Sequence, residues 1–284
     1  MSFNSQIAAE MLEEARLILN IGSAIPADKP LLVILGGQPG SGKSSAIEMI
    51  EARFNDNIFA LNGDDFKELY PNYEELLKSN QEQTTHQVQP YSNYVVNKLK
   101  AEYSNQKYNI IIEGTMRTSE VPLATINEFK AKGYQIEAYV VASNYYASRT
   151  GCLHRMELDI LDNGYGRAVP VESHNAAYNN IPTTMQTLIQ YGQLENLTVM
   201  SRNGEVLGEL KNSDDVVGIY QNHRNQLGEG QYQQIKANLN EVLELMQKRN
   251  ALPDEIQNVA NLQTEFQNYY KGFYAQQCHP VREW

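Results

Sequence analysis

The segment Gly-Gln-Pro-Gly-Ser-Gly-Lys-Ser at residues 37–44 constrains this chain more than any other part of its sequence. It matches the G-x-x-x-x-G-K-S pattern of a phosphate-binding loop, with an apolar run at 31–35 before it and a helical pattern at 45–54 after it. The glycines let the backbone fold around an anion, so that N–H groups and the helix start point at phosphate oxygens. An accidental match of a glycine-rich loop is the alternative, but the strand before and the helix after favour phosphate binding.

The loop assigns roles to individual residues. Lys43 is expected to reach the β- and γ-phosphates of a nucleotide such as ATP, and the hydroxyl of Ser44 to hold Mg²⁺. Such a loop serves kinases, nucleotide switches and motors, so it does not by itself name a reaction. The predicted nucleotide-binding residues are Gly37, Gln38, Pro39, Gly40, Ser41, Gly42, Lys43, Ser44 and Ser45.

Apolar runs alternate with helical patterns between residue 31 and about residue 200. This alternation predicts an α/β fold in which a parallel sheet carries helices on both faces. Ligands bind such sheets beyond the carboxyl ends of the strands, so the polar residues that follow each strand are candidates for a site. Besides 31–35, strands are predicted at 58–61, 109–113 and 135–142, and helices at 45–54, 91–99 and 121–132.

The rest of the chain reads as helices and one hairpin. Turn-forming residues at 162–166 break a long helical segment, and a hairpin is predicted at 197–210. Residues 1–20 have the apolar spacing of an amphipathic helix, with Leu17 among its apolar positions, and two helices are predicted over 231–274. We divide the chain into an N-terminal helix (1–28), an α/β domain with the phosphate loop (29–224) and a helical C-terminal segment (225–284).

The composition is that of an ordinary globular protein of 284 residues, with 42% hydrophobic and 20% charged residues. No run of about 18 apolar residues is present, so we expect no membrane span, and residues 1–20 do not resemble a signal peptide. Cys152 and Cys278 fit neither a metal site nor a disulfide framework, which favours a reducing cytoplasm. The net charge of −11, with dispersed basic residues, disfavours nucleic acid as the main ligand.

Two polar segments that follow predicted strands supply carboxylates. Asp64, just beyond the strand at 58–61, can accept a proton from an attacking hydroxyl or help to order Mg²⁺. A helix N-cap is the alternative, and it suits Asp65 better than Asp64. Glu113 ends a strongly apolar strand and needs a partner there, which Arg117 or a bound substrate could supply. Recognition of sugar hydroxyls or amides and a structural Glu113–Arg117 pair both remain open.

Arg155 and Arg167 lie on either side of the break at 162–166. Their planar guanidinium groups match phosphate oxygens and could stabilise charge on a transferring phosphoryl group. The alternative is that both are ordinary surface arginines. The five histidines show no metal-ligand spacing, so structural roles are favoured for them.

With these residues identified, the chain resembles the zeta toxins of bacterial toxin–antitoxin systems. These are phosphate-loop kinases that phosphorylate UDP-N-acetylglucosamine on the 3′-hydroxyl of the sugar. The resemblance covers about residues 30–200. Several short segments match in the same order, which is more specific than the loop alone. They are 36–44, 64–67, 70–73, 90–93, 112–115, 117–118 and 132–134, followed by Arg155, Arg167 and 181–183.

The resemblance implies a P-loop kinase-like fold and a role for each matching residue. Asp64 corresponds to the family's base on the sugar hydroxyl, and Lys43, Arg155 and Arg167 correspond to its phosphate clamps. Asn97 departs from the family, which has a glutamate on the helix at that position. The residues expected to hold the nucleotide sugar are Asp65, Asn97, Glu113, Thr115, Arg117 and Thr125.

The resemblance fades from about residue 225. The segment 225–284 is either a helical buttress or an inhibitory element, whereas the family uses a small helical antitoxin that obstructs the nucleotide site in trans. We therefore expect a cytoplasmic kinase that uses Mg²⁺ and ATP on UDP-N-acetylglucosamine and that is restrained in trans or in cis. The rival interpretations are a kinase of another acceptor (a dinucleotide, an antibiotic or a nucleic-acid end) and a nucleotide-dependent switch ATPase.

Overall fold

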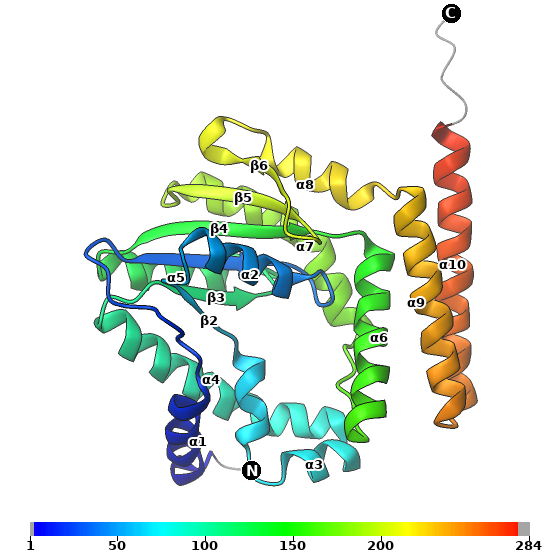
Figure 1. The fold of residues 1–284 in the computed structure, drawn as a ribbon, viewed down its shortest axis with the longest axis horizontal. Coiled ribbons are helices and arrows are strands. Elements are labelled where there is room, and N and C mark those ends of the chain that lie inside the picture. The colour runs from blue at the N-terminus through cyan, green and yellow to red at the C-terminus, as the bar shows by residue number, and fades with distance from the viewer. Residues whose placement is uncertain (1–2, 278–284) are drawn as a thin grey trace, which may run out of the picture.

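The computed structural model describes residues 3–277, and its centre is a six-stranded sheet in the order β2-β3-β1-β4-β5-β6 (Figure 1). Strands β1 to β5 pair in parallel, and β6 runs antiparallel to β5. The predicted α/β fold is confirmed, and the hairpin expected at 197–210 consists of β5 and β6. The strands are β1 (Leu31–Gly36), β2 (Phe59–Leu61), β3 (Ile110–Gly114), β4 (Gln135–Ala142), β5 (Asn196–Ser201) and β6 (Val206–Glu209).

Helices cover both faces of the sheet because successive strand residues point to opposite sides. Val33 and Leu35 of β1 pack with α2 (Lys43–Arg53) on one face. Leu32 and Ile34 belong to a larger cluster on the other face. Helices of that second face are α1 (Ser5–Ile18), α4 (Gln81–Asn105), α5 (Glu120–Ala131), α7 (Val171–Tyr191) and α8 (Val216–Asn225).

The N-terminal helix α1 is amphipathic as predicted, with Ala8, Met11, Leu12 and Ala15 buried. The assignment of Leu17 to its apolar face was wrong, because that side chain is 85% exposed. Leu17 lies about 200° around the helix from Ala15, which turns it away from the core.

The prediction for α4 was too short. The helix begins at Gln81 rather than at Tyr91, and Pro90 lies inside it. The Oδ1 of Asn80 accepts the N–H of Gln83 at 2.9 Å and so caps the earlier start. Thr84 and Val88 are buried and anchor this first part of the helix.

The chain after β4 forms two long helices joined by residues 164–170. α6 (Tyr145–Asn163) ends where Gly164 takes a left-handed conformation with φ 78°, which is the predicted break. α7 follows and leads into β5. Three shorter elements that the sequence did not reveal are η1 (Gly63–Leu69), α3 (Tyr73–Ser79) and η2 (Leu210–Asn212).

The C-terminal part forms a helical pair, α9 (Glu229–Lys248) and α10 (Pro253–Gln277), that packs beside α6 (Figure 1). Its apolar residues make a cluster of their own, joined by Tyr146 and Leu153 from the outer side of α6. None of the helices described is both long and apolar enough to span a bilayer. The division at residues 28 and 224 stays a prediction, and Cys278 and His279 lie outside the described residues.

Candidate active site

The phosphate loop connects β1 to α2, and two of its positions can be occupied only by glycine. Gly40 and Gly42 have φ values of 72° and 96°, a region that other residues rarely adopt. A Cβ on Gly40 would lie 2.2 Å from the carbonyl oxygen of Ser148 on α6. The loop therefore packs directly against the backbone of α6 at Gly40.

Three side chains of the loop have distinct surroundings. Ser44 is exposed at the start of α2, and Ser41 is buried with no hydrogen-bond partner for its Oγ among the described residues. Gln38 is fully buried, and its Nε2 donates to the carbonyl of Ser143 at 2.9 Å and to the Oγ of Ser148 at 3.3 Å. The Gln38 side chain therefore anchors the loop to α6.

Lys43 lies over the loop and faces a carboxylate. Its Nζ donates to the carbonyl oxygens of Gly37 at 3.0 Å and Gln38 at 3.4 Å, and lies 3.6 Å from Oε1 of Glu113. Burial lowers the pKa of Lys43, and the charge of Glu113 opposes that shift. The predicted alternative of a structural Glu113–Arg117 pair was wrong, because the cation beside Glu113 is Lys43, from across the parallel β1–β3 pair.

The short helix η1 after β2 presents Asp64 between two cations. Its Oδ1 lies 2.7 Å from Nζ of Lys67, and its Oδ2 lies 3.8 Å from Nη1 of Arg167. Burial would raise the pKa of Asp64, but Lys67, Arg167 and Arg155 outweigh it, so the pKa is lowered from its usual value. The Asp64 carboxylate therefore stays ionised near neutral pH. Because its pKa is low, it can accept a proton only from a group whose own pKa falls during a reaction.

The predicted cap role of Asp65 was wrong, because Asn62 caps η1. The Oδ1 of Asn62 accepts the N–H of Asp64 at 3.0 Å, and its Nδ2 donates to Asp65 at 3.2 Å. Burial raises the pKa of Asp65, with Glu113 and Asp64 adding to the shift. The Glu113 carboxylate therefore lies close enough to Asp65 for its charge to raise the pKa of Asp65.

The two predicted arginines reach this region from neighbouring segments. Arg167 lies in the connection between α6 and α7, and its Nη1 is buried without a hydrogen-bond partner in the described part of the chain. Arg155 on α6 is close enough for its charge to lower the pKa of both Lys43 and Asp64. The arrangement thus gathers positive charge, and a donor in need of an acceptor, around the Asp64 carboxylate.

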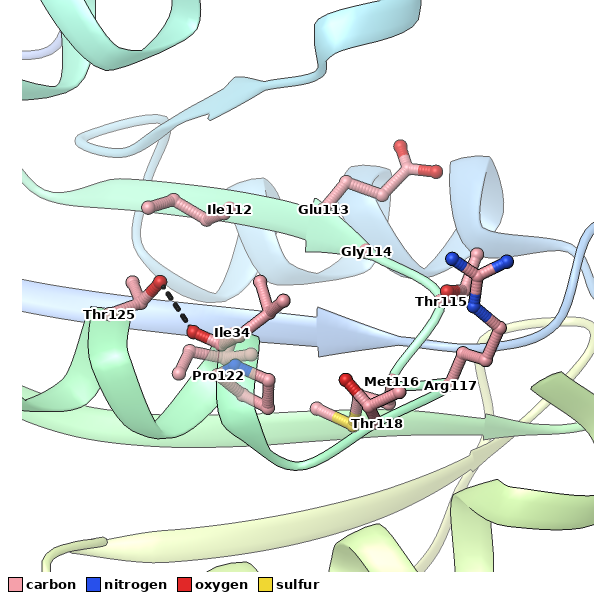
Figure 2. A pocket seen from close by; sticks show the side chains of 11 residues that line it. Ile34, Ile112, Glu113, Gly114, Thr115, Met116, Arg117, Thr118, Pro122 and Thr125 are labelled. Carbon is pink, nitrogen blue, oxygen red and sulfur yellow. Dashed lines mark hydrogen bonds between the residues drawn. The ribbon is translucent and has the colours of Figure 1, made fainter. Parts of the chain in front are cut away.

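A pocket of about 260 Å³ opens beyond the end of β3 (Figure 2). Glu113, Thr115 and Arg117 line it from β3 and the loop that follows, and Thr125 lines it from α5. The Thr125 hydroxyl donates to the carbonyl of Val121 at 3.0 Å, drawn as a dashed line in Figure 2. Its apolar lining consists of Ile34, Ile112, Met116, Val121 and Pro122.

Asn97 differs from the other predicted acceptor residues. It is exposed on α4 and is not among the residues that line this pocket. Thr115, Arg117 and Thr125 do line the pocket, as does Glu113. Their roles toward a substrate stay predictions.

Sequence reasoning missed one residue that touches the phosphate loop. Arg202, in the turn between β5 and β6, donates from Nη1 to the carbonyl of Gly40 at 2.5 Å. It lies inside the hairpin predicted at 197–210. Its position after a strand of the parallel sheet was the signal that could have found it, because the carboxyl ends of such strands share one edge.

Comparisons with known proteins agree on one family. The family model described as Zeta toxin matches residues 19–213. The chain is 35% identical to Toxin zeta of Enterococcus hirae over 198 residues, which cover 68% of this chain and 69% of that protein. It is 28% identical to Toxin PezT of Streptococcus pneumoniae over 223 residues, which cover 78% of this chain and 85% of the toxin.

Solved structures show the same fold. A chain from the PezAT chromosomal toxin-antitoxin system of Streptococcus pneumoniae superposes with a TM-score of 0.75 at 23% identity, covering 86% of this chain and 98% of that one. A chain from the complex of AvrRxo1-ORF1 and AvrRxo1-ORF2 with ATP superposes with a TM-score of 0.55 at 15% identity, covering 93% and 84%. At these identities the likeness describes the fold alone.

Proposed function

Because this chain belongs to the zeta toxin family, we propose that it is a toxin kinase that transfers the γ-phosphate of ATP to the 3′-hydroxyl of UDP-N-acetylglucosamine. The loss of this cell-wall precursor would then arrest growth. The observation that carries the proposal is the convergence of Lys43, Asp64 and Arg167 at one edge of the sheet. The family relation supports a phosphotransferase, and the choice of acceptor is the part that we propose.

The donor half of the site is the phosphate loop. In the structure Lys43 is held by Glu113 at 3.6 Å and by two loop carbonyls. The phosphates of ATP are stronger acceptors than these carbonyls, so we expect Lys43 to exchange them for β- and γ-phosphate oxygens. Glu113 would then be released toward the acceptor pocket that it also lines.

Asp64 is the proposed base. Its carboxylate is ionised near neutral pH, because Lys67, Arg167 and Arg155 lower its pKa. A sugar hydroxyl that hydrogen-bonds to it would become acidic as the bond to phosphorus forms, and Asp64 would take that proton. Thr115, Arg117 and Thr125 provide hydroxyl and guanidinium groups for the nucleotide sugar in the adjoining pocket, with Asp65 and Asn97 as further predicted contacts.

Arg155 and Arg167 are the proposed clamps on the transferred phosphoryl group. The buried Nη1 of Arg167 has no hydrogen-bond partner among the described residues, and a phosphate oxygen would satisfy it. Arg155 lies on α6, which packs directly against the loop at Gly40. Both cations would offset the negative charge that accumulates in the transition state.

The residues present also fit Mg²⁺. Ser44 places an exposed hydroxyl at the start of α2, where Mg²⁺ bound to nucleotide phosphates needs one protein oxygen and keeps several waters. The ion would neutralise phosphate charge when bound. Lys43 and the two arginines supply the remaining positive charge.

The proposed partner is an antitoxin that acts in trans in the cytoplasm, as the toxin–antitoxin description of the PezAT structure suggests by analogy. We propose that residues 225–284 are a buttress of the α/β domain at 29–224 rather than an inhibitor. Helices α9 and α10 pack on the outer side of α6, whereas the phosphate loop contacts α6 at Ser148 and Cys152. In the described part of the segment, α9 and α10 therefore pack on α6 residues other than those that the loop contacts.

Incubation of the protein with Mg²⁺, ATP and UDP-N-acetylglucosamine tests the proposal. Mass spectrometry should show one added phosphate on the nucleotide sugar, and the Lys43→Ala variant should form none. A panel of nucleotides, dinucleotides, antibiotics and nucleic-acid ends serves as the set of competing acceptors. Transfer to one of these alone would replace the acceptor, and phosphate release without a phosphorylated acceptor would indicate a switch ATPase.

A further inference from the structure

We propose that Arg202 is a positioning residue for nucleotide binding, which it serves by holding the Gly40 carbonyl of the phosphate loop away from the bound phosphates. The proposal rests on the proposed function, since it assumes that the loop binds a nucleotide. Arg202 follows β5, and β5 runs parallel to β4 and β1, so its carboxyl end shares an edge of the sheet with the loop (Figure 1). Neither the family match nor the predicted site includes this role.

The guanidinium of Arg202 joins three parts of the fold. Its Nη1 donates to the carbonyl of Gly40 at 2.5 Å and to the carbonyl of Ala147 on α6 at 3.3 Å. Its own backbone belongs to the turn after β5. Among the described residues no carboxylate lies within ion-pair distance of Arg202, so its charge is not cancelled locally and its acceptors are these carbonyls.

Two glycines leave the room that Arg202 occupies. A Cβ on Gly42 of the loop would lie 2.7 Å from the Arg202 carbonyl oxygen and 2.8 Å from its Cγ. A Cβ on Gly151 of α6 would lie 3.0 Å from Nη2. Glycine weakens the middle of a helix relative to alanine, so its presence at position 151 needs a reason. The guanidinium and the Gly40 carbonyl oxygen, which would lie 3.2 Å from the same Cβ, supply it.

The bond to the Gly40 carbonyl matters because that peptide can rotate. Gly40 has a φ of 72°, and a glycine allows the adjoining peptide to flip more easily than any other residue. The N–H of the same peptide, that of Ser41, donates to the Gln38 carbonyl at 3.1 Å. A flipped peptide would break this bond and turn the Gly40 carbonyl oxygen toward bound phosphate, which it would repel. By its hydrogen bond, Arg202 keeps the Gly40 carbonyl turned toward itself and away from the phosphate site.

The loss of this contact is tested with Arg202→Met, using Arg53→Met at the far end of α2 as the matched control. Arg53 contacts Tyr139 and Glu137, away from the loop. Isothermal titration should show that Arg202→Met weakens binding of Mg²⁺–ATP, Mg²⁺–GTP and Mg²⁺–tripolyphosphate to a similar extent, by about tenfold. Arg202→Lys keeps a cationic donor and should recover part of the loss. Arg53→Met should bind all three as the unaltered protein does.

A second variant crowds the guanidinium and the Gly40 carbonyl without removing either. Gly151→Ala should weaken Mg²⁺–ATP binding by about threefold, because its methyl would lie 3.0 Å from Nη2 of Arg202 and displace the guanidinium. Because the added methyl would also lie 3.2 Å from the Gly40 carbonyl oxygen, the double variant Gly151→Ala with Arg202→Met separates the two contacts. If it binds Mg²⁺–ATP no more weakly than Arg202→Met alone, the methyl acts through the guanidinium. Unchanged affinity in Gly151→Ala would overturn the need for the bridge to α6.

The outcomes separate the two proposals. If the unaltered protein fails to bind Mg²⁺–ATP, the proposed function fails. If it binds and Arg202→Met binds equally well, the role of Arg202 is overturned while the kinase proposal stands. Loss of ATP binding with retained tripolyphosphate binding would also overturn it, because Arg202 would then contact the base rather than orient the loop.

Discussion

At the scale of single residues, Asp64 is distinguished by the two cations that flank its carboxylate, Lys67 at 2.7 Å and Arg167 at 3.8 Å. Asp64→Asn keeps the shape and removes the basicity. We expect kcat to fall about 10²- to 10⁴-fold, with little change in the Kd of Mg²⁺–ATP. Initial rates and calorimetry measure the two quantities, and Glu68→Gln, an exposed carboxylate on the same helix η1, is the control. An equal loss of ATP affinity in Asp64→Asn would point instead to a magnesium-binding or structural role.

A second residue-scale prediction concerns His174, which is fully buried, with Nε2 2.8 Å from the Oγ of Ser148. Burial lowers its pKa from 6.5 to about 4, partly offset by Asn175, while Arg149 adds to the lowering. The unfolded chain therefore takes up a proton near pH 6.5, whereas the folded chain resists until near pH 4. The free energy of unfolding should fall by about 3 kcal/mol over that window as the pH decreases.

Urea denaturation at several pH values between 4.5 and 7 checks this dependence, which His174→Gln should make shallower. His86→Gln, on the exposed side of α4, should leave the slope of the unaltered protein. An unchanged slope in His174→Gln would assign the acid sensitivity to other groups.

Sequence reasoning at this scale found residue types but not their partners. Asp64, Glu113 and Lys43 were identified because they follow strands or complete a motif. The pairing of Lys43 with Glu113 depends on the β1–β3 register, which no local pattern encodes. Arg202 was missed for the same reason, since its contact with Gly40 spans 162 residues.

At the scale of secondary-structure elements, a salt bridge between the C-terminal end of α9 and α6 has a buried carboxylate. Arg249 donates to Glu157 from Nε at 2.7 Å and from Nη2 at 2.9 Å, and the Glu157 side chain is 0% exposed. Arg249→Met leaves a buried carboxylate without a partner and should lower the free energy of unfolding by about 3 kcal/mol. The double variant Glu157→Met with Arg249→Met should recover most of that loss, since two apolar side chains need no ion partner.

Urea denaturation of both variants measures these differences, with Lys248→Met as the exposed control on the same helix. If the double variant is as unstable as Arg249→Met, packing around the pair, rather than the unpaired charge, dominates the cost.

Elements were predicted well where a local signal marks both ends. The β4 prediction at 135–142 agrees with the structure because a turn at Gly133 precedes a β-rich run that is apolar from Ala138 to Ala142. The start of α4 was missed because its first part is polar, with Thr84 and Val88 as its buried anchors before Pro90. Tertiary packing supports that part of the helix, and periodicity alone does not reveal it.

At the scale of the whole molecule, the function of the C-terminal pair decides how the kinase is restrained. Apolar residues of α9 and α10 cover Tyr146 and Leu153 on the outer side of α6, and a further link joins His154 to Glu241 at 2.8 Å. The inner side of the same helix supports the loop at Gly40 and carries Arg155 toward Asp64. Removal of residues 225–284 would therefore expose an apolar surface and loosen the helix that presents Arg155.

We expect the protein without residues 225–284 to be less stable and less active, not more active. Growth arrest and phosphorylated nucleotide sugar should be measured at matched protein levels, with circular dichroism of the purified truncated chain to verify that it is folded. A folded truncated protein that arrests growth more strongly would contradict the buttress and support inhibition in cis. Equal activity would exclude inhibition in cis and confine the segment to a contribution to stability. Lower activity would leave restraint to a partner in trans, because the chain would then need its own C-terminal helices in order to work.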